Sequence, residues 1–302
     1  MMIRTIAPLV LLTLSASLLP LRADLLVYEP FDYPAGGLNA AGGSTDFGFS
    51  GNWSANATTE VVASDRGYGS LPTTGGSVGN LSGGQNRPGG TRAIDGSIAG
   101  AGLLADGREL WFSAVMGYDA GGNRTNSRLA LSLGSTGFNN ANFSYVLDEA
   151  GATGLGVTLG RFGGNGRIVA TQFRDGSVGG TSGFADNVFG DGSGTVVLPG
   201  SNAQVDVALV VGRFTWGAAS DTLDIFLPDA GLSLGAVHST LTVDVNQSLY
   251  DTISFKRGDR VVIDELRFGA SANDVLGVIP EPSSIGLTLF GMLGLLLRRR
   301  WS

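Results

Sequence analysis

The middle of the chain alternates apolar and polar residues with a period of two, which is the pattern of half-buried β-strands. Every second residue is apolar in 205–211, and Leu223, Ile225 and Leu227 repeat the pattern after a short loop of Gly, Ala and Ser. Two alternating runs joined by such a loop predict a β-hairpin. Trp216 lies at the turn of this predicted hairpin.

Further runs of the same kind follow along the chain, each bounded by Gly, Asn or Asp. They predict strands over 108–119, 127–134, 154–162 and 167–173. No stretch between 24 and 277 keeps a 3.6-residue apolar period over three turns, so we expect one all-β domain there. We also expect 25–33, near the start of this domain, to pair beside 261–269 near its end.

The composition agrees with many short strands and excludes several classes of function. The chain has 302 residues, 49 of them Gly, and only 15% are charged. A net charge of −7 disfavours nucleic acid as a partner, because phosphate binding requires a basic surface. The chain has no cysteine, which excludes disulfides, thiolate nucleophiles and zinc–thiolate sites.

The first residues have the order of a secretory signal peptide. Arg4 precedes an apolar stretch over 6–19, and the small residue Ala23 comes before the polar Asp24. A charged, then apolar, then cleavable segment predicts export through the Sec machinery, with 1–23 removed after Ala23. An uncleaved membrane anchor is the alternative.

The last residues have a different order. An apolar segment of 13 residues, Ile285–Leu297, would rise about 20 Å as a helix, against a hydrocarbon core of roughly 30 Å. It can span if it includes the serines before it and if the basic residues after it extend to the interface. These basic residues, which would stay on the cytoplasmic side, are Arg298, Arg299 and Arg300. Pro280 and Pro282 hold Glu281 in an extended backbone.

Together these features resemble the PEP-CTERM sorting signal, here over 278–302. The resemblance rests on Pro280-Glu281-Pro282, the apolar segment and the final arginine cluster. It implies export in a Gram-negative bacterium, transient anchoring in the inner membrane, and processing by an exosortase. The implied destination is the cell surface or an extracellular matrix that contains exopolysaccharide. A plain C-terminal anchor is the alternative.

A second resemblance concerns the domain over 24–277. The hairpin 212–228 and the later strand 263–269 resemble those of the concanavalin A-like (laminin G-like) jelly roll, and 25–54 is similar to the start of exported proteins with such a domain. The resemblance implies a two-sheet antiparallel jelly-roll sandwich.

Some enzymes on this fold cut β-glucans with two glutamates spaced Glu-x-Asp-x-x-Glu on one strand. The chain has six glutamates, and no two of them have this spacing: Glu29, Glu60, Glu109, Glu149, Glu265 and Glu281. Asp264 and Glu265 are adjacent, and neighbours on a strand are expected to point to opposite faces. We therefore favour a non-catalytic protein. The alternative is a divergent polysaccharide-active enzyme, a glycosidase or lyase.

Two other kinds of site find little support. Gly75–Gly79 fits G-x-S-x-G around Ser77, but no strand precedes it, no helix follows, and His238 is the single histidine. No cofactor is expected. A structural Ca²⁺ is left open, because 185–194 is rich in Asp but lacks EF-hand spacing.

Two residues of the domain are the candidates for contact with a ligand. Asp264 is predicted to share a face with Val262, Leu266 and Phe268 at the margin of the core. There it would accept backbone N–H groups from a neighbouring turn, with a ligand or metal role as the alternative. Trp216 is predicted to be more exposed than the strand residue Trp111, and to offer a platform for a sugar ring.

Overall fold

The structure, a computed structural model, describes the main part of the chain in several stretches. These are residues 25–42, 47–79, 89–118, 128–139, 145–162, 165–175, 187–189, 206–258 and 261–277. The predicted signal peptide and sorting signal lie outside them. Within these stretches no helix has the length and apolarity needed to cross a membrane.

The larger of two β-sheets holds nine strands among the described residues. In spatial order they are β14 (Val237–Val243), β13 (Asp221–Phe226), β12 (Asp206–Thr215), β7 (Glu109–Tyr118), β16 (Val261–Gly269), β5 (Ser77–Gly79), β4 (Glu60–Val62) and β2 (Gly36–Gly37). The ninth, β1 (Leu25–Glu29), pairs with β16. We call this the large sheet.

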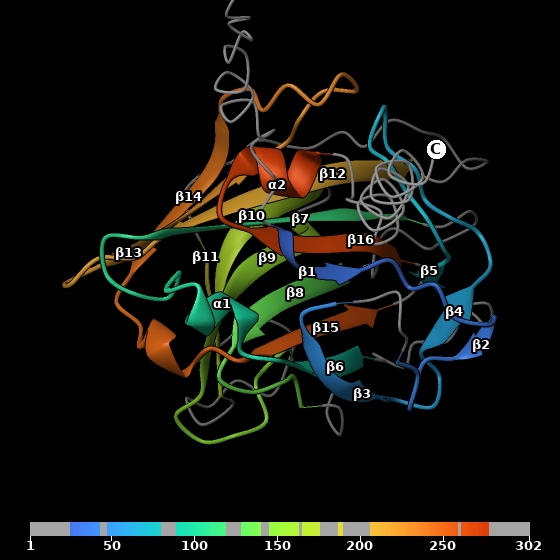
Figure 1. Ribbon diagram of the computed structural model, residues 1–302, viewed down its shortest axis with the longest axis horizontal. Helices are drawn as coiled ribbons and strands as arrows, with labels where there is room; N and C mark the ends of the chain where they lie inside the picture. The colour runs from blue at the N-terminus through green and yellow to red at the C-terminus, as the bar shows by residue number, and fades with distance from the viewer. Residues whose placement is uncertain are drawn as a thin grey trace, which may run out of the picture.

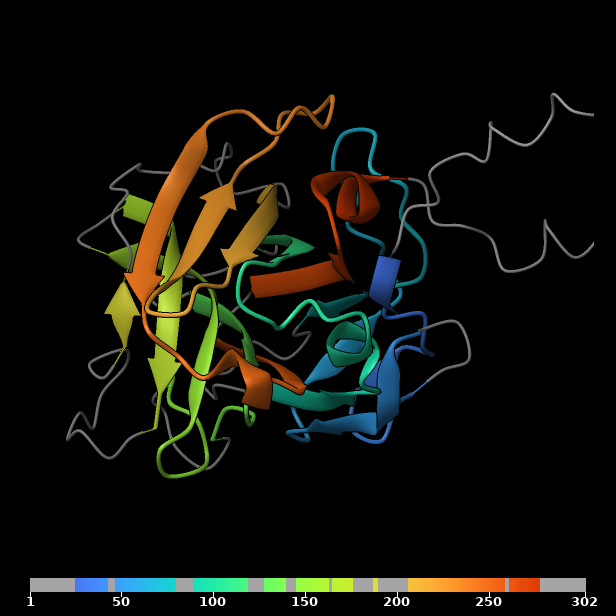
Figure 2. The ribbon, with the colours of Figure 1, turned by 60° about the vertical axis from the view of Figure 1, so that its left-hand side comes forward.

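The small sheet faces it and has seven strands in the part of the chain that is described. Their order is β11 (Val188–Phe189), β10 (Asn165–Arg174), β9 (Thr153–Phe162), β8 (Arg128–Gly134), β15 (Thr252–Gly258), β6 (Gly89–Ile94) and β3 (Phe49–Ala55). The turned view of Figure 2 shows the two sheets as layers. Helices are short: α1 (Ser97–Gly100), α2 (Ala272–Leu276) and the 3₁₀ turn η2 (Gln247–Leu249).

The chain passes repeatedly from one sheet to the other. It crosses between β2 and β3, β3 and β4, β5 and β6, β6 and β7, β7 and β8, β11 and β12, β14 and β15, and β15 and β16. This is how a jelly roll winds, with antiparallel neighbours in each sheet that are distant in sequence. The predicted all-β sandwich of two antiparallel sheets is confirmed, and so are the β12–β13 hairpin and the strands β7, β8, β9 and β10.

The two ends of the domain lie side by side, as the sequence predicts. Leu25 pairs with Gly269 and Tyr28 with Arg267, in an antiparallel ladder between β1 and β16 (Figure 1). A strand near the start of the chain is therefore held by the last strand of the domain.

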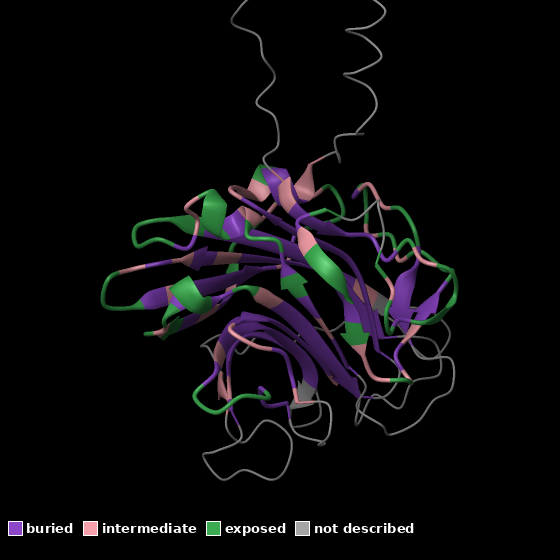
Figure 3. Cartoon of the chain, turned by 60° about the horizontal axis from the view of Figure 1, so that its bottom comes forward, coloured by how far each residue is buried: buried purple, intermediate pink, exposed green. Residues whose placement is uncertain are grey.

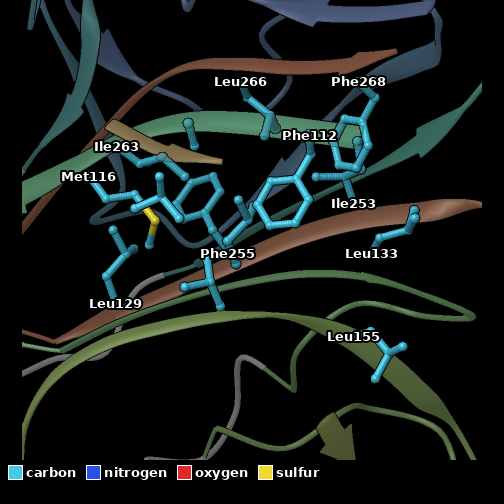
Figure 4. Close-up of a cluster of buried hydrophobic side chains, with 14 of the residues drawn as sticks. Phe112, Met116, Leu129, Leu133, Leu155, Ile253, Phe255, Ile263, Leu266 and Phe268 are labelled. Atoms are coloured by element: carbon cyan, nitrogen blue, oxygen red, sulfur yellow. The ribbon is translucent and has the colours of Figure 1, made fainter. Parts of the chain in front are cut away.

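The main core fills the space between the sheets. Side chains of β7 and β16 meet those of β15, β8 and β9, and Phe112, Phe268 and Phe255 are among the largest (Figure 4). Strand residues are buried through most of both sheets, while the exposed residues gather in the connections (Figure 3). Because this cluster includes side chains from both sheets, it holds the two sheets together.

A smaller apolar cluster lies on the outer face of the large sheet. Trp111, Val115, Leu209 and Val211 form its base. The connection 63–76, the connection 227–236 and α2 cover it with further apolar side chains, which are Leu71, Val275, Tyr68, Leu232, Leu234 and Leu276. The outer face is thus closed over β16, β7 and part of β12.

Candidate functional site

Part of the predicted site lies outside the described residues. This applies to the cleavage position Ala23 and to the sorting residues, which are Pro280, Glu281, Pro282, Arg298, Arg299 and Arg300. Most of the Asp-rich segment 185–194 is also outside. In the described stretches, no group of three or more His, Asp or Glu side chains is placed to hold a metal ion.

The prediction that Trp216 is more exposed than Trp111 is wrong. Trp216 is 1% exposed and Trp111 7%. The Trp216 indole N–H donates to the carbonyl of Leu103 at 2.7 Å, and its ring stacks on Phe214 at 5.1 Å between centroids. The reason is alternation: Phe214 points into the core, and Trp216, two residues later, points the same way. Trp216 presents no open ring face to a sugar.

Asp264 is fully buried and accepts two backbone N–H groups. Its Oδ2 accepts from Arg66 N at 2.9 Å, in the connection 63–76, and its Oδ1 accepts from Glu265 N at 2.8 Å. The predicted structural role is therefore confirmed. The predicted face is wrong in part, because Leu266 and Phe268 belong to the main core, whereas Asp264 lies opposite Val115 on the outer face.

A β-bulge in β16 causes this change of face. Asp264 pairs with Val115 and Arg267 with Ser113, so three steps on β16 match two steps on β7. Glu265, the extra residue, has a φ of 52°, a left-handed backbone that is uncommon outside glycine. Because of the bulge, Asp264 and Glu265 do not point to opposite faces as the sequence suggested.

Three buried ionisable side chains of β16 hold the connection 63–76 against the sheet. Asp264 binds the backbone of Arg66, and Glu265 Oε1 accepts from Thr74 N at 2.8 Å. Between these two points, the Arg267 guanidinium donates to the carbonyl of Pro72. We call Asp264, Glu265 and Arg267 the β16 clamp.

Arg267 also binds the end of the domain. Its guanidinium donates to Glu265 Oε2 at 2.6 Å, to Gly277 O at 3.3 Å and to Val275 O at 3.5 Å. The Tyr28 hydroxyl donates to the Glu265 carboxylate at 3.1 Å, and the guanidinium lies over the Tyr28 ring. The clamp therefore joins the first strand, the connection 63–76, and α2 with the residue that follows it.

Burial is the main cause of the raised pKa values of the two carboxyl groups in the β16 clamp. It raises the pKa of Asp264 to about 9, and the nearby Glu265 adds to this while the N–H of Arg66 opposes it. Burial also raises the pKa of Glu265, against the opposing charge of Arg267. Carboxyl groups with such pKa values serve as catalytic acids when a substrate can reach them. Here both side chains are 0% exposed and accept backbone N–H groups of the chain itself.

A second buried carboxylate lies at the opposite end of the described sequence. Glu29 Oε2 accepts from Tyr33 OH, Trp53 Nε1 and Arg92 at 2.7 Å each. Its Oε1 accepts from Phe31 N. Burial raises the pKa of Glu29, and these donors act against the rise. With 0% exposure, Glu29 also serves the fold rather than a substrate.

Ser77 and His238 have structural partners as well. Ser77 is fully buried on β5, and its hydroxyl donates to Ser64 O at 2.8 Å. His238 lies at the seam between the sheets, with Nε2 3.1 Å from Ile168 O of β10. The two are on separate strands with separate partners, so the structure does not combine them into a nucleophile and base.

An open polar surface does exist, on the part of the large sheet that the outer connections leave uncovered. Two cross-strand rows run over β7, β12, β13 and β14, and their members directly oppose one another. We call them the outer polar strip, which consists of Trp111, Arg213, Asp224 and Thr240 in one row and Glu109, Thr215, Thr222 and Thr242 in the other. Trp111 and Asp224 are buried, and the other six are exposed or half-buried.

The charged members of the strip are already linked. Arg213 donates to Asp224 Oδ2 at 2.7 Å and lies 3.6 Å from Glu109 Oε1. Thr240 donates to Asp224, and the Trp111 indole N–H donates to Glu109. The side chains of Arg213 and Glu109 are 31% and 44% exposed, so solvent reaches this network.

Aromatic rings lie beneath the Arg213 guanidinium. Its central carbon is 5.5 Å from the Trp111 ring centroid and 5.8 Å from that of Phe226, and these two rings are nearly parallel. The sequence did carry a signal for this surface. Arg213 continues the period-two series of Leu209 and Val211, so it had to lie on their face, where the apolar series ends.

No family model and no curated protein matches the chain. Among solved structures, the binding domain of botulinum neurotoxin serotype C1 shares 12% identity with a TM-score of 0.37, over 72% of this chain and 46% of that one. The chain thus spans about half the length of that structure. The CBM2 module of the evolved Dit of Lactobacillus casei BL23 phage J-1 shares 12% identity with a TM-score of 0.37, over 82% of this chain and 95% of that module. A carbohydrate esterase of bacteriophage phi24B shares 15% identity with a TM-score of 0.35, over 72% of this chain and 90% of that one. Overlaps of this extent carry no function to this chain.

Proposed function

We propose that the protein is an exported, non-catalytic jelly roll of the cell surface or extracellular matrix, where it contacts exopolysaccharide. An exosortase would process it at the Pro280-Glu281-Pro282 segment after the Sec machinery has exported it and the tail has anchored it in the inner membrane. The sequence features at both ends support the route, and the arrangement of the described domain supports the role.

The observation that carries the non-catalytic role is the sealed β16 clamp. Asp264 and Glu265 are the adjacent acids that the bulge brings to one face, yet neither is exposed. Each accepts a backbone N–H from the connection 63–76. Glycoside hydrolysis requires an acid and a second carboxylate on either side of the scissile bond, in a cleft that admits a sugar chain. A pair covered by its own chain cannot meet this condition.

The contact role follows from the chemistry of the exposed surface. The outer polar strip presents hydroxyl, carboxylate and guanidinium groups, and the guanidinium lies over buried aromatic rings. Sugars present hydroxyls at their edges and C–H groups on their faces, so a surface of this composition suits them.

A binding and cleavage assay with the full chain, purified in detergent, tests the proposal. The purified protein is incubated with exopolysaccharide and with a panel of defined glycans. Retention on the glycan and the release of reducing or unsaturated ends are then measured separately. We expect retention with no release. Release of new ends that persists after repeated purification would favour the alternative, a polysaccharide-active enzyme. Absence of retention on every glycan would contradict the contact role.

A further inference from the structure

The outer polar strip is an open polar face on the described part of the large sheet. We infer that it is the surface that contacts glycan, and that its ligand is an uncharged polysaccharide. The inference rests on the proposed function, because it specifies where the contact occurs and which chemical class it accepts.

Only part of the outer face of the large sheet is accessible to a ligand. Over β16 and β7, the outer face of the large sheet is closed by the connections 63–76 and 227–236 and by α2. Beyond them, the strip is open, since Thr242 and Glu109 are exposed and Thr215, Thr222 and Thr240 are half-buried. The open part of the strip therefore consists of its threonines, Arg213 and Glu109, while Asp224 is buried and Trp111 belongs to the covered apolar cluster.

The outer polar strip is long and shallow. Adjacent strands of a sheet lie about 4.8 Å apart, so four strands place the members of one row across roughly 14 Å. Side chains directly opposite one another point the same way, which makes the strip a shallow surface of two parallel rows. Such a surface suits an extended chain lying across the strands rather than a single compact ligand.

The charges of the outer polar strip are paired with one another. The single guanidinium of the strip, that of Arg213, lies between the carboxylates of Asp224 and Glu109. An anionic polymer would meet one cation already paired and two carboxylates. The hydroxyls of an uncharged sugar meet acceptors on the carboxylates, donors on the guanidinium, and both on the threonines.

Two aromatic rings support the guanidinium at the centre of the strip. The Arg213 guanidinium lies over Trp111 and Phe226 and holds its charged groups at fixed positions. Both rings are buried, so the guanidinium that they support provides the surface for the C–H face of a sugar. The strip thus offers a sugar both hydrogen-bonding groups and one stacking surface, the Arg213 guanidinium.

The test uses two strip variants of different kinds. Arg213→Ala removes the charged centre, and the double variant Thr222→Val/Thr242→Val removes two hydroxyls while keeping β-branched side chains that favour the strand. The matched controls lie on the small sheet or in a connection beside it. These are Arg174→Ala on β10, where the side chain donates to Gln172, and Thr136→Val in the connection after β8.

Binding of the full chain to immobilised laminarin, galactomannan, alginate and dextran sulfate is measured at several concentrations. We expect at least one uncharged glycan to bind, each strip variant to weaken its Kd at least tenfold, and the controls to change it less than twofold. Thermal unfolding of each variant shows whether it is folded, and the threonine variant still decides the matter if Arg213→Ala is not.

Four results would overturn parts of the inference in different ways. Unchanged binding in both strip variants would place the contact elsewhere and leave the proposed function intact. Tighter binding of alginate or dextran sulfate would refute the uncharged ligand. Concentration-dependent self-association that Arg213→Ala abolishes would make the strip a contact between copies of the chain. Lack of binding to any glycan by the unaltered protein would refute the proposed function itself.

Discussion

The Glu265 carboxylate and the Arg267 guanidinium form an ion pair of 2.6 Å in which neither side chain is exposed. Removing one partner leaves a buried charge without compensation, which costs about 3–5 kcal/mol in proteins. We therefore expect Glu265→Ala to lower the free energy of unfolding by about this amount, measured by urea denaturation.

Two comparisons show whether the ion pair is the cause. Glu109 pairs with Arg213 at 3.6 Å on the surface, so Glu109→Ala should cost less than about 1 kcal/mol. The double variant Glu265→Ala/Arg267→Met removes both charges and should be more stable than Glu265→Ala alone. A double variant that is less stable would show that the loss comes from other contacts of Arg267.

The buried Asp264 carboxyl makes stability depend on pH in the direction opposite to that of an acid whose pKa is lowered by folding. Its pKa is about 9 in the folded protein, against 3.8 for the unperturbed group. Between these values the folded state holds a proton that the unfolded state releases, so this contribution to stability is present below about pH 4. It is lost progressively as the pH rises to about 9.

Asp264→Asn tests this contribution. The variant cannot release the proton, but its amide N–H₂ would face one of the two backbone N–H groups that Asp264 accepts. We expect it to be less stable than the unaltered protein at pH 5 and the difference to shrink toward pH 9. Urea midpoints from pH 5 to 10 measure this. A difference that stays constant over that range would show that Asp264 is ionised throughout.

The sequence predicted those parts of the fold that depend on local alternation. The β12–β13 hairpin follows from two period-two runs and a short loop, and the pairing of β1 with β16 agrees with the expectation. The same rule, extended by one residue past Thr215, would have placed Trp216 in the core beside Phe214. A position at a turn does not by itself expose a side chain, and Trp216 is buried there.

The β16 clamp could not be predicted in the same way. Glu265 adopts a left-handed backbone without being glycine, and its carboxylate binds Thr74 and Arg267. Thr74 is 191 residues away in sequence, so no local pattern indicates the bulge. The face assigned to Leu266 and Phe268 relative to Asp264 was wrong for this reason. The outer polar strip likewise requires the order of four strands, which alternation within one strand does not give.

The connection 63–76 depends on one glycine where the backbones of two connections come close. Gly69 has a φ of 54°, and a Cβ there would collide with the backbone of Ala230 in the connection 227–236. We expect Gly69→Ala to displace the connection and to increase its hydrogen exchange. Gly67→Ala is the matched control, because its Cβ would meet only Thr73 Oγ1 at 3.9 Å. Equal exchange in the two variants would contradict this role of Gly69.

Trp216 and Trp111 should differ in what a smaller ring costs. Trp216→Phe leaves the carbonyl of Leu103 without its buried donor and alters the stack on Phe214, which should cost about 1–3 kcal/mol for the lost hydrogen bond alone. Trp111→Phe removes a bond to the exposed Glu109 and should cost less. Urea denaturation of both variants measures the difference. A larger loss for Trp111→Phe would contradict the burial of Trp216.

The tail is proposed to be a removable address rather than part of the domain. The described fold ends with α2 and Gly277, whose carbonyl accepts from Arg267, and Glu281 lies only four residues further along. We expect deletion of 285–302 to leave the unfolding transition unchanged and to release a folded protein that is not sorted. Glu281→Ala should instead keep the protein in the inner membrane, because the extended segment between the two prolines would no longer be processed. Mass spectrometry of the protein at the cell surface decides between these possibilities. A surface form that still ends at Ser302 would show that the tail is only an anchor.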